Sequence, residues 1–202
     1  MTSQIPDTLL VDGQEYSIAA INGDSLFSPD DYGLTPAHTF TACWRGWLCQ
    51  YALADGWLVL DNLRMNLTLV PESGEVGEPI GFGGPRLNGL HPVFPNDEVW
   101  PFNNRYDWLN LTIPFTGRLL AGRGLTQESY RHMGFQPAWQ YRSVLEVVAH
   151  QGQVTDVFDV SERIAAIREA LSRRPLLPNG PGAGELNIQA WVAVANQINY
   201  PG

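Results

Sequence analysis

The sequence predicts an α+β fold: a mainly antiparallel curved sheet, or a partly closed β-barrel, built from successive hairpins and followed by a C-terminal helix. Three observations predict it. Short apolar runs flank Asp12-Gly13 and Asp55-Gly56, dipeptides that favour the type I′ turns of hairpins. The strand-like segments follow one another without helical segments between them. Helical spacing of apolar residues begins only near residue 160.

The strand segments are expected in hairpin order. The first hairpin is "TLLVDGQEYSI" (8–18), the second spans 40–70, and the third is "QYRSVLEVVAHQGQVTDVFDV" (140–160), which turns near Gln151-Gly152. Between the last two, "LNLTIPFTGRLLAG" is another strand pair or a bent strand, since Pro114 marks an edge or a bend. The Pro/Gly-rich stretch 71–102 is a long irregular connection of the kind that is usually functional or flexible.

One helix is expected after the strands. Asp159 can cap it, with Glu162 completing a capping box, and the helix continues to about Arg173. Residues 1–174 then form a single α+β domain, 175–184 a Pro/Gly linker, and 185–202 a C-terminal appendage. The apolar residues in "NIQAWVAVANQI" suit a short second helix or a strand about equally well.

The charge pattern bears on possible partners. All twelve basic residues are arginine; residues 1–100 carry thirteen acidic and three basic side chains, and residues 101–202 carry eight acidic and nine basic ones. An acidic half without basic clusters offers nothing for phosphate binding, so nucleic acid is not an expected partner. It favours a cationic surface on a protein partner, although net acidity also simply maintains solubility. With no apolar run of membrane-spanning length and no signal-peptide pattern, we expect a cytoplasmic protein that does not bind membranes.

The stretch "TACWRGWLCQYALADGWLVL" (41–60) combines three tryptophans, both cysteines and one arginine. A two-residue turn at Asp55-Gly56 pairs Ala54 with Trp57, and the same register pairs Cys49 with Asn62 and Arg45 with Asn66. Alternation then places Cys43, Arg45, Trp47, Cys49 and Tyr51 on one face and Trp44, Leu48 and Ala52 on the other. Both faces are largely apolar, which predicts a central, buried hairpin whose tryptophans serve mainly in packing.

Arg45 is the exception in this stretch, because a guanidinium on a central strand needs a partner or a wet opening. One interpretation is structural: Arg45 stacks on Trp47 and pairs with a carboxylate or a carbonyl. The other is functional: Arg45 anchors an anion or a carboxylate at the mouth of a pocket.

No motif in the sequence predicts a cofactor, a metal or a catalytic site. Cys43 and Cys49 do not have a usual zinc spacing, and on one strand they would lie too far apart for a disulfide. The cluster "GFGG" (81–84) does not open a helix, and no nucleophile elbow or Walker A motif is present. His132, among aromatic residues and next to Arg131, is the histidine with the most suggestive surroundings.

The segments "IPDTLLVDGQEYSIAAING", "TACWRG", "IPFTGRLL" and "YRHMGFQPAWQYRSVLEV", in this order, cover most of residues 5–170. In these segments the chain resembles a family of uncharacterised bacterial proteins. The resemblance implies that Cys43–Gly46, Thr116, Gly117 and His132–Gly134 occupy motif positions, and it implies no activity. Residues from about 175 onward fall outside it.

We therefore expect a non-catalytic bacterial protein that acts through a binding surface, as an immunity-type or accessory subunit does when it docks on another protein. The alternatives are a protein that binds a small anionic ligand and an enzyme that uses Arg45 and His132. The candidate ligand- or partner-binding residues come from the motif segments: Arg45, Trp47, Thr116, Gly117, His132 and Gln136. Since polar groups among aromatics are costly unless they serve a common site, Arg45, Thr116 and His132 are expected to converge.

Overall fold

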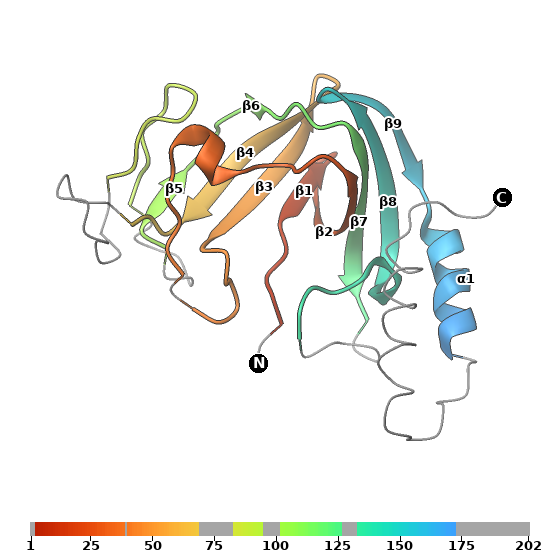
Figure 1. Cartoon of the computed structure of the whole chain (residues 1–202). Coiled ribbons are helices and arrows are strands. Elements are labelled where there is room, and N and C mark those ends of the chain that lie inside the picture. Colours follow the sequence, from red (N-terminus) through yellow and green to blue (C-terminus); the bar gives the residue numbers. More distant parts are fainter. Residues whose placement is uncertain (1–2, 39, 69–82, 95–101, 127–132, 173–202) are drawn as a thin grey trace.

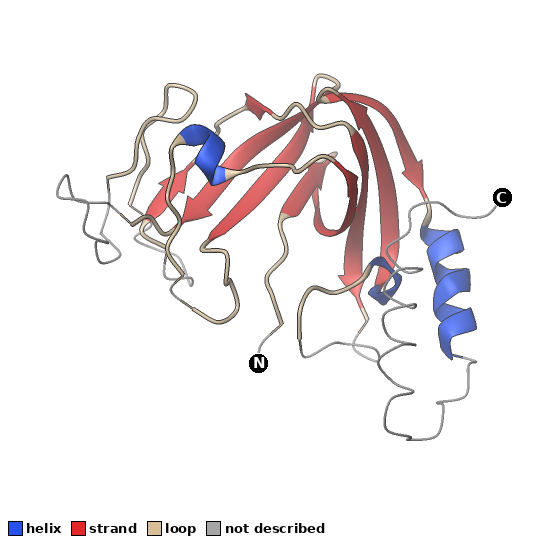
Figure 2. Ribbon diagram, in the orientation of Figure 1, coloured by secondary structure: helices blue, strands red, loops and turns tan. Residues whose placement is uncertain are grey.

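The structure, a computed structural model, describes residues 3–38, 40–68, 83–94, 102–126 and 133–172 (Figure 1). Its strands are β1 (Thr8–Val11), β2 (Gln14–Gly23), β3 (Trp47–Ala54), β4 (Trp57–Met65), β5 (Asn104–Tyr106), β6 (Leu111–Thr112), β7 (Gly117–Leu125), β8 (Tyr141–His150) and β9 (Gln153–Asp159). The helices are α1 (Ser161–Ser172) and two short 3₁₀ segments, η1 (Pro29–Tyr32) and η3 (Ala138–Gln140). The predicted α+β class, a mainly antiparallel curved sheet with a C-terminal helix, is confirmed (Figure 2).

The strands form a ring of hydrogen bonds that is not a regular barrel. The path runs β3-β1-β2-β7-β8-β9-β4, and β3 also pairs with β4. All neighbouring pairs are antiparallel except β1 and β3, which run parallel. The shortest strand pairing in the ring is that of β9 with β4, where one residue pair, Gln153 and Trp57, joins the two strands.

The three predicted hairpin turns are confirmed. Asp12-Gly13, Asp55-Gly56 and Gln151-Gly152 each connect two antiparallel strands. Both residues of each turn have positive φ, between 49° and 86°, as a type I′ turn requires. The segment containing Pro114 holds two separate strands and is neither a bent strand nor a pair bonded to each other, because β6 bonds to β4 whereas β7 bonds to β2 and β8.

The register of the β3–β4 hairpin follows the prediction only near its turn. Ala54 pairs with Trp57 and Tyr51 with Leu60, as expected. Asp61 is then an extra residue on β4, so Cys49 pairs with Leu63 and not with Asn62. Such a bulge directs two successive side chains to the same side of a strand. Asp61 and Asn62 are indeed both half-buried, whereas the next residue, Leu63, is fully buried.

Two cores hold the sheet together. The larger one fills the inside of the ring with the inward side chains of successive strands, among them Leu9, Tyr51, Leu63, Tyr106 and Leu119. The smaller one lies on the outer face of β7 and β8, where Trp139 of η3, Ile164 of α1 and the preceding Val160 pack with Leu120, Tyr141 and Val144.

The helix begins where the sequence predicts. Asp159, the last residue of β9, accepts a hydrogen bond from the backbone N–H of Ser161 at 2.9 Å. The bond to Ser161 lowers the pKa of Asp159, because it stabilises the carboxylate. The predicted helix end at Arg173, the linker 175–184 and the appendage 185–202 lie outside the described residues.

Candidate functional site

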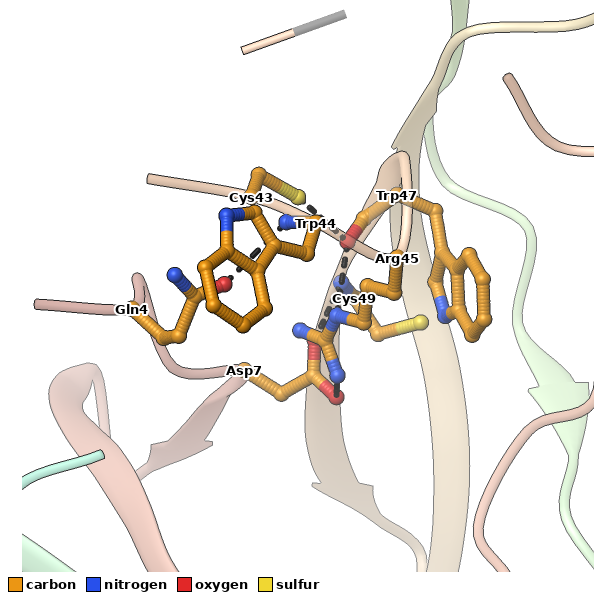
Figure 3. A network of polar contacts seen from close by, with 7 residues as sticks. All are labelled: Gln4, Asp7, Cys43, Trp44, Arg45, Trp47 and Cys49. Carbon is orange, nitrogen blue, oxygen red and sulfur yellow. Dashed lines mark hydrogen bonds and ion pairs between the residues drawn. The ribbon is translucent and has the colours of Figure 1, made fainter. Parts of the chain in front are cut away.

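Arg45 sits at the centre of a compact network at the start of β3 (Figure 3). Its NH1 and NH2 groups donate to the two carboxylate oxygens of Asp7 at 2.8 and 2.5 Å, and its Nε donates to the carbonyl of Trp47 at 2.8 Å. The guanidinium carbon lies 5.6 Å from the centre of the Trp47 ring. Arg45 therefore has both partners of the structural interpretation, the Trp47 ring and a carboxylate.

Asp7 is the less accessible partner, with a side chain 11% exposed against 26% for Arg45. It also accepts a hydrogen bond from the Cys49 backbone N–H at 2.6 Å. Burial raises the pKa of the Asp7 carboxyl, and Arg45 and the Cys49 N–H oppose that rise. Burial alone would lower the pKa of Arg45, but the attraction of Asp7 outweighs it and the pKa is raised. The charge of Arg45 is thus compensated within the chain.

The loop that carries Arg45 is not part of a strand, which corrects the prediction that the first strand of the second hairpin (40–70) runs back through Arg45 to Cys43. Here β3 begins only at Trp47, and the chain turns at Gly46, whose φ is +83°. A Cβ at Gly46 would lie 2.5 Å from the carbonyl oxygen of Ala37, so the backbone approaches too closely for any side chain. Because residues 41–46 turn, the alternation predicted from Cys43 to Trp47 does not apply.

The expectation that the tryptophans serve mainly in packing is wrong for two of the three. Trp44 is 56% exposed and Trp57 is 42% exposed, whereas Trp47 packs against the inner core. Trp44 lies in the turn before β3, and Trp57 is the first residue of β4 after the Asp55-Gly56 turn. Both lie outside the central part of the hairpin, where packing would cover an indole.

Residues 3–5 connect two of the motif segments. The Gln4 N–H donates to Gly134 O, and the Ile5 N–H donates to Ala42 O, both at 2.9 Å. The Gln4 side chain completes the link, because its Nε2 donates to Thr41 O at 2.8 Å and its Oε1 accepts from the Trp44 N–H at 3.1 Å. Figure 3 shows the Gln4 side chain reaching the backbone of Trp44. The N-terminal segment therefore lies between the "TACWRG" and "HMGFQ" segments.

Gln136, a predicted site residue, belongs to the same assembly. It is buried, and its Nε2 donates to Ser3 Oγ at 2.9 Å. The residues just before it on the chain are exposed, with Met133 at 50% and Phe135 at 49%. Gln136 thus fixes the position of a segment whose large side chains reach solvent.

Thr116 and Gly117 lie at the other end of β2. Gly117 pairs with Gly23, and a Cβ on Gly117 would come within 2.3 Å of the carbonyl oxygen of Asn22. The Thr116 hydroxyl accepts a hydrogen bond from the Gln151 N–H at 2.9 Å. These two residues position the third hairpin turn against β2.

The structure does not bring Thr116 and Gly117 together with Arg45. Asp7, the residue that pairs with Arg45, accepts a hydrogen bond on its backbone carbonyl from the Ile18 N–H of β2. Gly117 instead pairs with Gly23, at the far end of the same strand. Five residues of strand separate the two positions, or about 15 Å along β2. His132 lies outside the described residues, so its predicted approach to Arg45 stays a prediction.

The two cysteines are unsuited to nucleophilic chemistry. Both are buried free thiols, and burial raises the pKa of each. Across the described ranges, no three His, Cys, Asp or Glu side chains gather as metal ligands would. No helix within those ranges is long and apolar enough to cross a membrane.

Sequence reasoning missed Asp7 and the exposed residue Trp108. Asp7 meets Arg45 because β1 runs parallel to β3, a long-range pairing that no local pattern reports. Trp108, 77% exposed in the connection from β5 to β6, had only the weak turn signal of "YDWLN".

Comparisons with protein-family models, with curated proteins and with solved structures gave no match. They assign neither a family nor an activity, and the resemblance drawn from the motif segments stays a prediction.

Proposed function

We propose that the protein is a non-catalytic binding module that docks on another protein, in the manner of an immunity-type or accessory subunit. The observation that carries the proposal is a group of exposed side chains bordering residues 3–5: Trp44, Met133 and Phe135, here called the motif surface. Aromatic residues and methionine are enriched in protein interfaces. In the proposal the motif surface is the interface.

The motif surface is held on a rigid base. Residues 42 and 134 bond to neighbouring residues of the N-terminal segment, so their backbones lie about two strand spacings, or about 10 Å, apart. The Arg45–Asp7 pair fixes the loop behind Trp44, and Gln136 fixes the segment behind Phe135. A loop whose backbone is held in place before binding loses less conformational entropy on association.

The anionic-ligand alternative gains less support from the geometry. Arg45 already gives three donors to Asp7 and Trp47, so an anion would have to displace a bidentate carboxylate. The alternative of an enzyme using Arg45 and His132 gains no support from the geometry, because His132 lies outside the described residues. A cationic contact surface on the protein partner remains the expected one, because the first hundred residues carry ten more acidic than basic side chains.

Affinity capture from a native lysate with three forms of the full chain tests the proposal. The forms are wild type, a Trp44→Ser/Phe135→Ser double variant, and Trp57→Ser as the matched control for an exposed tryptophan. We expect one protein to be retained by wild type and by Trp57→Ser and lost by the double variant. Loss of the Trp44 and Phe135 side chains should change stability little, since both are half exposed. Equal retention by all three forms, or retention by none, would overturn the proposal.

A further inference from the structure

The turn after β5, residues 107–110, holds a tryptophan in solvent. Trp108 is 77% exposed and has a φ of +57°, in the left-handed region that bulky residues rarely adopt. The backbone N–H of Trp108 donates to Asn62 Oδ1 at 3.1 Å, and the backbone N–H of Leu109 donates to the Asp61 carbonyl at 2.7 Å. Leu109 is buried and its carbonyl accepts from Asn88. The backbone is therefore fixed on both sides while the indole faces water.

The turn faces the bulge in β4. Asp61 is the extra residue of that bulge, so its side chain and that of Asn62 reach the same side of the sheet as the turn. From Asn62 a row of polar side chains continues across β3 to the first hairpin. Asn62 Nδ2 donates to Gln50 Oε1 at 2.6 Å, and Gln50 Nε2 donates to Glu15 Oε2 at 2.7 Å. The row joins Trp108 at one end to Glu15 at the other.

Within the described ranges, two carboxylates in this row have no cationic partner. Among the described residues, no arginine pairs with Asp61 or Glu15, whereas Asp107 is paired with Arg105 at 2.9 Å. Burial raises the pKa of Asp61, and the nearby charge of Asp107 adds to the rise. A positive charge placed there would favour the ionised carboxylate and so oppose the rise in the pKa of Asp61.

The atoms of the row that can form further hydrogen bonds are mainly acceptors. Both N–H groups of the Asn62 amide are used, by Gln50 and by Asp61, and its oxygen accepts from Trp108. The carboxylate oxygens of Asp61 and Glu15 have lone pairs to spare. A ligand suited to this row donates hydrogen bonds, carries positive charge and has a face that stacks on an indole. A guanidinium has all three properties.

We infer that Trp108 and Asp61 bind an arginine side chain of a protein partner, with the guanidinium over the indole face and donating to the Asp61 carboxylate. A single ring that is mostly in solvent encloses little of any small molecule, so the remaining contact area has to come from a polypeptide. The inference goes beyond the proposed function, because it rests on a different surface from Trp44, Met133 and Phe135.

The test uses the full-length protein and a capped Gly-Arg-Gly-Arg-Gly peptide, with the same peptide containing citrulline in place of arginine as a neutral control. NMR titration at low salt follows the Trp108 indole N–H signal, which is assigned by its disappearance in Trp108→Asn. Asparagine tolerates a positive φ, so this variant keeps the turn. We expect the arginine peptide to shift the Trp108 signal and the citrulline peptide to bind at least fivefold more weakly.

The variants separate the two surfaces. Trp108→Asn and Asp61→Asn should each weaken binding of the arginine peptide about threefold or more, as loss of one exposed cation–π or charge contact implies. In Trp108→Asn, which lacks the indole signal, the backbone amide signals of Asn62 and Leu109 report binding, and the same signals are followed in wild type for comparison. Trp44→Ser should leave peptide binding unchanged, so failure of this site and failure of the motif surface are distinguishable. An unshifted Trp108 signal, equal binding of the citrulline peptide, or wild-type affinity in Trp108→Asn would overturn the inference.

Discussion

The Arg45 loop and the Trp108 turn treat charge in opposite ways. Both flank the β3–β4 hairpin, and both combine a tryptophan with a carboxylate. In the Arg45 loop, Asp7 and Arg45 neutralise each other below the surface. At the Trp108 turn, Asp61 has no basic partner within the described part of the chain, and the indole is in solvent. The difference indicates that polar contacts hold the first region together, whereas the second region presents an exposed indole beside a carboxylate without a counter-charge, as the proposed arginine contact requires.

The largest expected effect lies in the Arg45 loop. Arg45→Ala leaves the Asp7 carboxylate buried without its counter-charge and should lower the free energy of unfolding by about 3–5 kcal/mol, measured by urea denaturation. Arg45→Lys should recover little of this loss, because an ammonium cannot reproduce the bidentate geometry. Asp7→Ala/Arg45→Ala should cost less than the sum of its single variants. If Arg45→Ala were as stable as wild type, Arg45 would be free for a ligand and the contrast between the two regions would fail.

The sequence predicted the kind of partner that Arg45 has but not the residue. Stacking on Trp47 and a carboxylate follow from the cost of burying a guanidinium, which is a local argument. The identity of Asp7 depends on the parallel pairing of β1 with β3, which is set by the closing of the ring. Hairpin turns were predictable for the opposite reason: Asp12-Gly13 and Asp55-Gly56 carry their conformational preference within two residues.

The bulge at Asp61 marks the limit of the prediction at the second region. A two-residue turn propagates a regular register, and nothing in "WLVLDNLRM" indicates where an extra residue interrupts it. In the structure the extra residue is Asp61, whose carbonyl accepts a hydrogen bond from the Leu109 N–H, a contact between residues 48 positions apart. The exposed Trp108 depends on that same contact, and for this reason the local sequence did not reveal it.

A second prediction concerns the residue that anchors the Trp108 turn in the core. Tyr106 is fully buried and its hydroxyl donates to Pro85 O at 2.8 Å; burial raises its pKa to about 12. The unfolded chain releases this proton near pH 10 and the folded chain near pH 12. The contribution of Tyr106 to the free energy of unfolding is therefore fully present below pH 10 and is lost as the pH rises from 10 to 12. A shift of about two units corresponds to about 3 kcal/mol.

The measurement is the slope of unfolding free energy against pH between 10 and 12. The slope is proportional to the number of protons released on unfolding, and Tyr106→Phe should lower that number by about one. Other buried tyrosines, such as Tyr51, still contribute to the slope. At neutral pH the variant should lose about 1 kcal/mol, because the Pro85 carbonyl loses its donor. An unchanged slope would mean that the core end of the turn admits water, and that the turn is less firmly anchored than the Arg45 loop.

The smallest effect, and the one that separates the two regions by sign, comes from a single substitution made in each. Trp108 has a φ of +57°, a conformation that costs a residue with a side chain about 1 kcal/mol or more and costs glycine nothing. Trp44 is also exposed but is not among the residues with positive φ. Trp108→Gly should therefore raise the free energy of unfolding by about 0.5 kcal/mol, because the relief of left-handed strain, about 1–2 kcal/mol, exceeds the freedom that glycine adds to the unfolded chain, about 0.5–1 kcal/mol, and little buried surface is lost with the indole. Trp44→Gly should lower it by about 0.5–1 kcal/mol, because glycine adds freedom to the unfolded chain without relieving strain.

Thermal unfolding of both variants against wild type measures the two signs. A loss of stability in Trp108→Gly would show that the indole stabilises the fold, and the turn would then belong with the Arg45 loop as a structural element. A gain would mean that the chain keeps a strained tryptophan at a stability cost, which is expected where the side chain serves a partner.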